Sequence, residues 1–255
     1  MPLSNIKKET QEVLENAYQA FAKPNFIESD PIQIPARFTT KEDIEISGFI
    51  AATIAWGQRP TIIRNANRLI ELMDGEPSDF IRNHESSDRE RFSGFVHRTF
   101  NDIDAMYFLE ALQHLYTVQN GLEGAFDSNG SVKERIAGFH HTFFGIPHLD
   151  RTKKHVSNPE KGSSAKRLNM FLRWMVRPNK EGIDFGIWKS ISPSELMMPL
   201  DVHTGNVGRK LGLLKRKQND WKAVEELTAS LRLLDPIDPI RFDLALFAMG
   251  VNKMI

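Results

Sequence analysis

The chain has 255 residues, of which 40% are hydrophobic and 26% charged, and its 33 Lys/Arg balance its 33 Asp/Glu. These proportions are typical of a soluble globular protein, and the zero net charge argues against a molecule covered in positive potential. Cysteine is absent, which excludes disulfides, zinc–thiolate sites, thiol catalysis and Cys-ligated iron–sulfur clusters. The N-terminal sequence does not resemble a signal peptide, and no apolar run reaches the ~20 residues that span a bilayer, so we expect a cytoplasmic protein.

The hydrophobic period is helical from the first segment onward. We expect a helix that ends near Ala22, with Ser4 or Asn5 as its N-cap, and then a Pro-punctuated loop over 23–35. Thr40, followed three residues later by Asp43, is a signal of the capping-box kind for the next helix. That helix is apolar nearly all round over 48–56, which predicts a position in the centre of a core.

The rest of the chain continues this pattern. We expect further helices at 61–73, 77–84, 102–119, 131–145, 163–177, 202–213, 220–233 and 239–250. Neither strand alternation nor an internal repeat is evident. The sequence therefore predicts an all-α protein, with lobes of about 40–150 and of 1–39 plus 151–255.

Positive charge is concentrated in one part of the chain. Between Arg151 and Lys217 there are fifteen Lys/Arg and five Asp/Glu, a local net charge of +10. A stretch of this kind favours contact with a nucleic-acid phosphate backbone, although a solvated helical surface has the same composition.

Lys166 stands at a position suited to chemistry. It follows the turn Gly162-Ser163-Ser164-Ala165 and opens a helical run. A short turn before a helix presents backbone N–H groups to an anion, and glycine allows a close approach because it has no Cβ. The same pattern also describes an ordinary N-cap followed by a solvated lysine.

Asp201 begins another helical segment, in Leu200-Asp201-Val202-His203. Aspartate is a good N-cap, worth ~1 kcal/mol to its helix. A capping role and a functional role for this carboxylate are compatible, because both need it at the start of the helix.

These two segments resemble the helix-hairpin-helix DNA glycosylases (the HhH-GPD superfamily). In that family a Gly-x-Gly-x-Lys hairpin supplies an attacking amine, and a Val-Asp-x-His segment supplies a carboxylate. Gly162 matches the first glycine, Ser164 stands in place of the second, and Lys166 and Asp201 match the catalytic pair. The likeness covers roughly residues 40–250, and the long interval between the pair is closest to the archaeal 8-oxoguanine branch. The whole chain also resembles a bacterial family of conserved proteins of unknown function.

The resemblance implies a fold, an activity and further site residues. It implies a two-lobed helical bundle with the active-site cleft between the lobes, acting as a monomer on double-stranded DNA with a damaged base, without metal or cofactor. Asp201 would stabilise the sugar cation, and Lys166 would attack C1′ and form a Schiff base. Gln58 would enter the duplex, and Asp243, Phe247 and His203 would lie by the base. Contacts to the DNA backbone would come from Gly162, Ser163, Ser164, Arg167 and Arg209.

Other interpretations of these residues remain open. Asp243, on a mostly apolar helix, is also expected to be a buried carboxylate paired with Arg241 or another Arg. Gln58 is also compatible with a solvent-exposed turn. The protein as a whole is also compatible with a non-catalytic DNA-binding protein on the same fold, or with a helical protein- or RNA-interaction module. A metal hydrolase has less support. Of the histidine cluster His140, His141 and His148, the adjacent pair points about 100° apart on a helix, and no His-Glu-x-x-His spacing is present.

Overall fold

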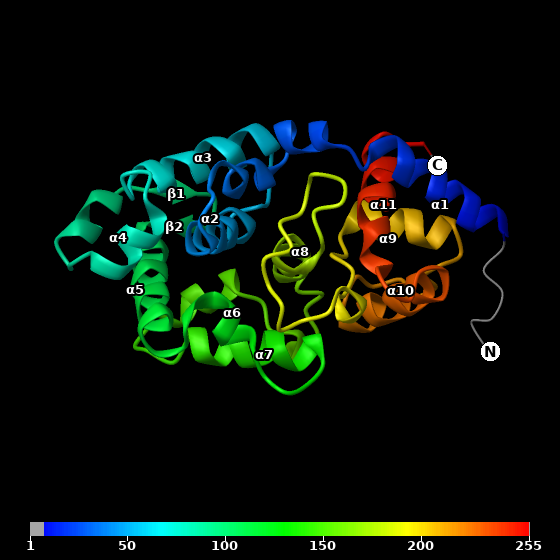
Figure 1. Cartoon of the computed structure of the whole chain (residues 1–255). Coiled ribbons are helices and arrows are strands. Elements are labelled where there is room, and N and C mark those ends of the chain that lie inside the picture. Colours follow the sequence, from blue (N-terminus) through cyan, green and yellow to red (C-terminus); the bar gives the residue numbers. More distant parts are fainter. Residues whose placement is uncertain (1–7, 255) are drawn as a thin grey trace. The chain divides into compact units, whose positions relative to one another are not determined.

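The computed structural model describes residues 8–254 and is mostly helical, which confirms the all-α class (Figure 1). Contacts divide the chain into two compact units. Unit 1 comprises residues 1–26 and 158–255, and unit 2 comprises residues 27–157. Residues 27–39 and 151–157, which the sequence analysis assigned to the other lobe, thus belong to unit 2. The expected N-cap at Ser4 or Asn5 lies outside the described residues.

Unit 2 is built around α2 (Lys41–Thr53). Thr40 is its N-cap, as predicted, and its hydroxyl accepts a hydrogen bond from the Asp43 amide at 3.4 Å. Every residue from Asp43 to Thr53 is buried, so the helix that is apolar nearly all round occupies the core, as expected. The other elements of unit 2 are α3 (Arg59–Glu71), α4 (Pro77–Asn83), β1 (Val96–His97), β2 (Phe100–Asn101), α5 (Asp102–Val118), α6 (Gly121–Phe126) and α7 (Val132–Phe143), with 3₁₀ turns at Pro31–Gln33, Pro35–Arg37, Asp88–Phe92 and Asp150–His155.

Phenylalanine rings fill the centre of unit 2. The Phe49 ring of α2 lies 5.5 Å from both Phe139 and Phe143 of α7 and 5.8 Å from Phe108 of α5, between ring centroids. Phe126 of α6 stacks on Phe139 at 4.0 Å. These aromatic contacts join four helices, because each helix contributes a ring from its apolar face.

Two features of unit 2 differ from the prediction. β1 and β2 form an antiparallel hairpin in which His97 pairs with Phe100, whereas the sequence showed no strand signal. Two-residue strands are too short to produce a visible alternation. α6 was also not expected as a separate helix. It is separated from α5 by Asn120, which adopts a left-handed conformation with φ of 56°.

Unit 1 contains the C-terminal helices and α1. Its elements are α1 (Lys8–Phe21), α8 (Lys166–Val176), α9 (Val202–Lys210), α10 (Trp221–Leu234) and α11 (Phe242–Val251), with 3₁₀ turns at Pro159–Lys161, Pro193–Glu195 and Pro239–Arg241; a further 3₁₀ turn, Pro24–Ser29, crosses the boundary between the units. α11 packs between α1 and α9. α11 and α9 approach each other closely at Gly250. A Cβ at this position would lie only 2.8 Å from the Cβ of His203, so the contact requires glycine.

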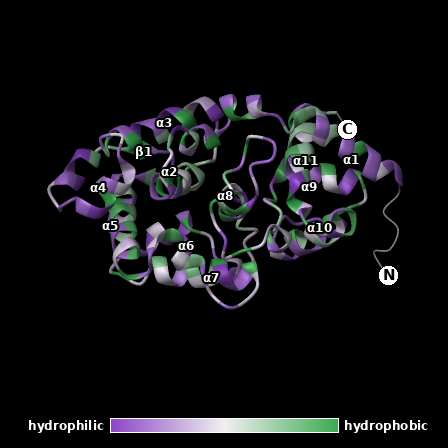
Figure 2. Cartoon of the chain, in the orientation of Figure 1, coloured by the Kyte–Doolittle hydropathy of each residue, from purple (hydrophilic) through white to green (hydrophobic). Residues whose placement is uncertain are grey.

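The returning loop after α8 completes its C-terminal end. The amides of Phe185 and Trp188 donate to the carbonyls of Trp174 and Met175 at 2.8 and 2.9 Å. Trp174 and Trp188 are both fully buried and belong to the core of unit 1. Hydrophilic residues are conspicuous along surface helices such as α3 and α4 (Figure 2). Among residues 8–254, no helix has both the length and the apolar character that crossing a membrane requires.

Candidate active site around Lys166 and Asp201

Lys166 and Asp201 lie side by side in unit 1. The Lys166 Nζ atom is 3.7 Å from Asp201 Oδ2, and the two side chains are 28% and 23% exposed. Thirty-four residues separate them in sequence, so tertiary structure brings the amine to the carboxylate. The pair is neither sealed in the core nor freely solvated, which leaves it accessible to a ligand.

The hairpin before α8 fixes the position of Lys166. Gly162 has φ of 84°, a left-handed conformation that glycine adopts readily, and its carbonyl accepts from the Trp221 amide at 3.1 Å. Ser163 forms an isolated antiparallel bridge with Asp220. Ala165 is also left-handed, with φ of 46°, so the chain reverses sharply just before Lys166. The turn thus ends where α8 begins, three residues later than the predicted start at residue 163.

Asp201 uses its two carboxylate oxygens for different contacts. It is the N-cap of α9, and Oδ1 accepts from the Thr204 amide at 3.0 Å and from the Thr204 hydroxyl at 3.2 Å. Its own amide donates to the Thr204 hydroxyl at 2.9 Å, which completes a reciprocal cap. Oδ2 is the oxygen that faces Lys166. Capping therefore orients the carboxylate and leaves one oxygen directed at the amine.

A second carboxylate, Asp243 of α11, lies buried close to this pair. It is 5% exposed and accepts a hydrogen bond from the Arg173 guanidinium of α8. Burial raises the pKa of Asp243 to about 6, against the opposing effects of Arg173 and of the positive charge of Lys166, while the negative charge of Asp201 adds to the increase. The prediction of a buried Asp243 is confirmed, and its partner is Arg173 of α8.

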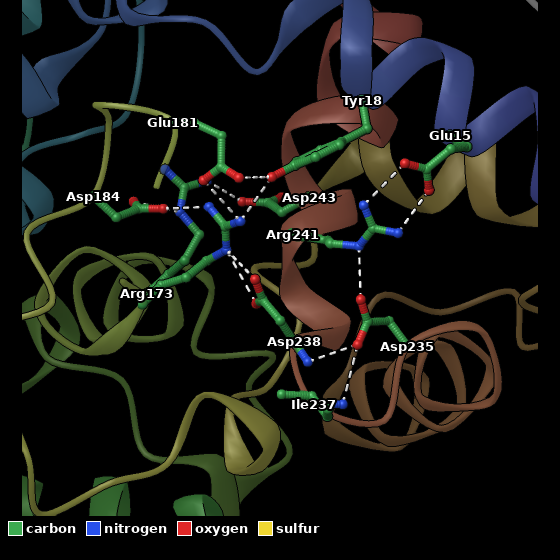
Figure 3. A network of polar contacts seen from close by, with 11 residues as sticks. Glu15, Tyr18, Arg173, Glu181, Asp184, Asp235, Ile237, Asp238, Arg241 and Asp243 are labelled. Carbon is green, nitrogen blue, oxygen red and sulfur yellow. Dashed lines mark hydrogen bonds and ion pairs between the residues drawn. The ribbon is translucent and has the colours of Figure 1, made fainter. Parts of the chain in front are cut away.

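Arg173 continues into an extended ion network (Figure 3). Its Nε donates to Asp184 at 3.2 Å, and the second oxygen of Asp184 accepts from Arg177 NH1 at 2.9 Å. Arg173 lies about two helical turns after Lys166, so α8 carries both cations on one face, and Arg177 follows as the C-cap residue of this helix. Asp184 comes from the loop that caps the same helix.

Arg177 is the centre of the distal part of the network. It is 1% exposed, and its Nε donates to both oxygens of Asp238 at 3.0 Å. Its NH2 donates to the Tyr18 hydroxyl at 3.0 Å and lies 3.1 Å from Glu181. Tyr18 in turn donates to Glu181, and burial together with this carboxylate raises the pKa of Tyr18 to about 12. The network fixes α1, α8, α11 and the 178–191 loop together behind Asp243.

Phe247 and His203 lie near one another in unit 1. Their rings contact edge to face with centroids 6.2 Å apart. Phe247 is partly exposed and stands one helical turn after Asp243 on α11. His203 is exposed and packs against Gly250, so its described contacts are with α11.

The residues expected at the DNA backbone have different environments. Arg209 donates to the carbonyls of Arg216 and Lys217, each at 2.8 Å, and therefore holds the loop after α9. Arg167 is partly buried, and burial lowers its pKa to about 10. In the hairpin, the Ala165 amide is bonded to the Ser163 hydroxyl at 3.2 Å. These contacts reduce the number of donors that the predicted phosphate surface can offer.

Gln58 belongs to unit 2, where it is exposed and serves as the N-cap residue of α3. Its side chain makes no hydrogen bond with any residue in the described range 8–254. It thus projects from a turn, as both of its sequence interpretations require.

The sequence comparison gives one family. The pattern of a family described as a protein of unknown function (DUF2400) matches residues 30–252. The chain belongs to this family. No curated protein and no solved structure matches the chain.

The matched region of this DUF2400 chain includes residues that the sequence analysis did not assign to the site. Arg173 and Asp184 support Asp243, yet neither was singled out. A usable signal was Arg173 among the apolar residues 170–176, with Arg177 directly after them, since buried arginines need carboxylate partners. Asp184 follows within the next loop, but Asp238 and Asp243 lie more than 60 residues further along the chain, and the sequence does not identify them as partners.

The +10 stretch of this DUF2400 chain is not one basic surface. Its first residues, 151–157, belong to unit 2 and the remainder to unit 1. Arg173 and Arg177 are buried against carboxylates and contribute no positive charge to the surface. The sequence count therefore overstates the charge available to a polyanion.

Residues 8–254 contain no group of three or more His, Asp or Glu side chains placed to hold a metal ion.

Proposed function

We propose that this protein is a base-excision DNA glycosylase with AP-lyase activity that removes a damaged purine, such as 8-oxoguanine, from duplex DNA. The observation that carries the proposal is the 3.7 Å contact between Lys166 Nζ and Asp201 Oδ2 in a partly open site. A nucleophilic amine beside an oriented carboxylate is the pair of groups that both chemical steps require.

In the first step the target base leaves the stack and its N-glycosidic bond breaks. The base departs with the bonding electron pair, and positive charge develops on the sugar. The Asp201 carboxylate stabilises that charge, and its orientation is fixed in advance because Oδ1 is held by Thr204.

In the second step Lys166 attacks C1′. The nitrogen of the neutral amine forms a bond to C1′ and releases a proton to solvent. The sugar ring then opens to a Schiff base, which acidifies the C2′ hydrogen. Loss of that proton expels the 3′ phosphate by β-elimination and cuts the strand.

The extruded base would meet Asp243 and Phe247, which are one turn apart on α11. Phe247 offers a partly exposed ring for stacking. Asp243 supplies a carboxyl group whose raised pKa of about 6 allows it to act as donor or acceptor near neutral pH.

Borohydride trapping on a panel of duplexes, each with one damaged base, tests the proposal. Wild type should form a covalent adduct with one or more of them, and Lys166→Gln should form none while it still binds DNA. Lys161→Gln is the matched control, because Lys161 is an exposed lysine of the same hairpin and should not alter trapping. Asp201→Asn should slow base release by a factor of a hundred or more with a modest change in affinity, by analogy with the loss of a stabilising group at a developing charge, ~10²-fold.

Equal trapping by Lys166→Gln and wild type would remove Lys166 from the mechanism. Binding of every duplex without base release or trapping would instead support a non-catalytic DNA-binding protein. Binding of single-stranded RNA alone, or of no nucleic acid at low salt, would support an interaction module.

A further inference from the structure

The turn that carries Gln58 is held in place by the β1–β2 hairpin of unit 2. His97 of β1 is 1% exposed and bridges two segments: its Nε2 lies 3.1 Å from the Trp56 carbonyl, and its Nδ1 lies 2.9 Å from Asn65 Nδ2 of α3. One neutral tautomer satisfies both contacts, with Nε2–H donating and Nδ1 accepting. These two contacts link the hairpin to the Trp56 turn and to α3, which lies beside β1 in Figure 1.

Arg98, at the tip of this hairpin, lies directly against the residue before Gln58. A Cβ on Gly57 would lie 3.3 Å from Arg98 Cδ and 3.4 Å from its NH1. Gly57 has φ of 107°, so this position both needs glycine for its backbone and leaves room for the arginine. The guanidinium of Arg98 and the amide of Gln58 thus come from neighbouring turns.

The backbone of Arg98 is held in an unfavourable conformation. Its φ is 57°, a left-handed value that costs a residue with a Cβ about 1–2 kcal/mol and that turns of this kind usually assign to Gly or Asn. The surrounding contacts maintain it: the carbonyl of the next residue, Thr99, accepts from Arg151 at 3.1 Å, and His97 anchors the preceding residue. Strain of this kind persists where surrounding structure over-determines it, and it is enriched at functional sites.

The side chain of Arg98 has no polar partner within the described residues. Arg98 is exposed, and within residues 8–254 it forms no hydrogen bond or ion pair. Gln58 is likewise exposed and unpaired in that range. By contrast, the neighbouring arginines Arg59 and Arg151 each contact a carboxylate, Asp30 and Asp104 respectively. An arginine without a carboxylate offers its full set of donors to an external anion.

We propose that Arg98 binds a backbone phosphate of duplex DNA and, with Gln58, forms the duplex-facing edge of unit 2. This inference rests on the proposed function for the identity of the polyanion as DNA. The planar guanidinium can hold a phosphate through two parallel hydrogen bonds, whereas Gln58 carries no charge and can enter the base stack beside it. The contacts of His97 hold the two turns that carry these side chains next to each other.

Arg98→Gly is the sharpest test, because it removes the side chain and also the strain. Glycine adopts a φ near 57° without cost, so this variant should fold at least as well as wild type. Its affinity for a duplex with an abasic-site analogue should fall roughly tenfold. The slope of log K against log salt should become less steep by about one, which corresponds to the loss of one phosphate contact. Arg98→Gln should lose affinity to the same extent, and Arg98→Lys should lose less because it keeps the charge.

The control is Arg89→Gln, since Arg89 is a partly exposed arginine of unit 2 that lies 4.0 Å from a carboxylate oxygen of Glu110. It should bind like wild type. Unchanged affinity in both Arg98→Gly and Arg98→Gln would overturn the inference, and so would a weaker affinity with an unchanged salt slope. If the Arg98 variants lost affinity equally for single-stranded DNA or RNA, the assignment of this contact to duplex DNA would be contradicted.

The two proposals fail separately in these experiments. Trapping that depends on Lys166, together with Arg98 variants that bind normally, would leave the glycosylase and remove the Arg98 contact. Loss of duplex binding in the Arg98 variants, without any base release or trapping by wild type, would leave the contact and remove the chemistry.

Discussion

The interiors of the two units use different chemistry. Unit 2 is centred on phenylalanine rings around α2, some stacked and some edge to face, and its buried carboxylate Asp104 pairs with the partly exposed Arg151. Unit 1 instead contains arginines that are themselves buried and bonded to buried carboxylates. Apolar packing depends on volume and shape and is insensitive to pH. A buried ion network depends on every partner being present and on its protonation, and it lies next to the candidate site. Fewer substitutions are therefore tolerated in the core of unit 1, because each buried charge needs its partner, and the charged groups near Lys166 are held in place as a result.

The largest effect should follow from breaking the network at Arg177. Arg177→Met leaves Asp238 without its guanidinium and Asp184 with one partner fewer, and we expect a loss of about 3–5 kcal/mol in the free energy of unfolding. Urea unfolding followed by circular dichroism measures it. Arg216→Met is the control, because its ion pair with Asp220 is solvent-exposed and its removal should cost far less than the removal of Arg177. Equal losses in the two variants would mean that burial of the network has no energetic consequence.

The pH dependence of unit 1 should come partly from Asp243. Its folded-state pKa of about 6 is above the ordinary aspartate value of 3.8, so folding favours the protonated form. Its contribution to stability is therefore fully present below about pH 4 and is lost as the pH rises through 6, by up to about 3 kcal/mol. Asp243→Asn cannot ionise, so the stability of wild type relative to this variant should fall between pH 4.5 and pH 7.

Asp220→Asn provides the contrast for that measurement. Hydrogen bonding to Arg216 lowers the pKa of Asp220 to about 2, so this group stays ionised over the same interval. Its difference from wild type should therefore be flat between pH 4.5 and pH 7. A flat difference for Asp243→Asn as well would show that Asp243 does not titrate in this range.

A smaller, pH-independent effect is expected in the aromatic core of unit 2. Phe143 contacts Phe49, Phe108 and Phe139 with ring centroids 4.8 to 5.6 Å apart. Phe143→Leu keeps an apolar side chain but removes these ring contacts, at a cost of about 1–2 kcal/mol. The cost should be the same at pH 4.5 and pH 7 in urea unfolding. Val118→Ala, at a half-exposed position of unit 2, should change stability by less than about 0.5 kcal/mol. A Phe143→Leu cost that varied with pH would erase the contrast between the two interiors.

Local sequence information was sufficient for most of the helices and for the positions of Lys166 and Asp201 at helix starts. The all-α class, the burial of α2, the Thr40 cap and the buried Asp243 could all be predicted, because hydrophobic period and capping act over a few residues. The β1–β2 hairpin was missed, since it is only two residues per strand and is stabilised by His97, whose partners come from other segments.

The sequence by itself placed a lysine after a hairpin and an aspartate at a helix start. Tertiary structure alone decided that these two groups lie 3.7 Å apart, that Arg173 holds Asp243 behind them, and that Arg98 lies against the Gln58 turn. The physical reason is range: capping and periodicity are set by neighbours in the chain, whereas a buried charge is tolerated only where distant segments converge to supply its partners.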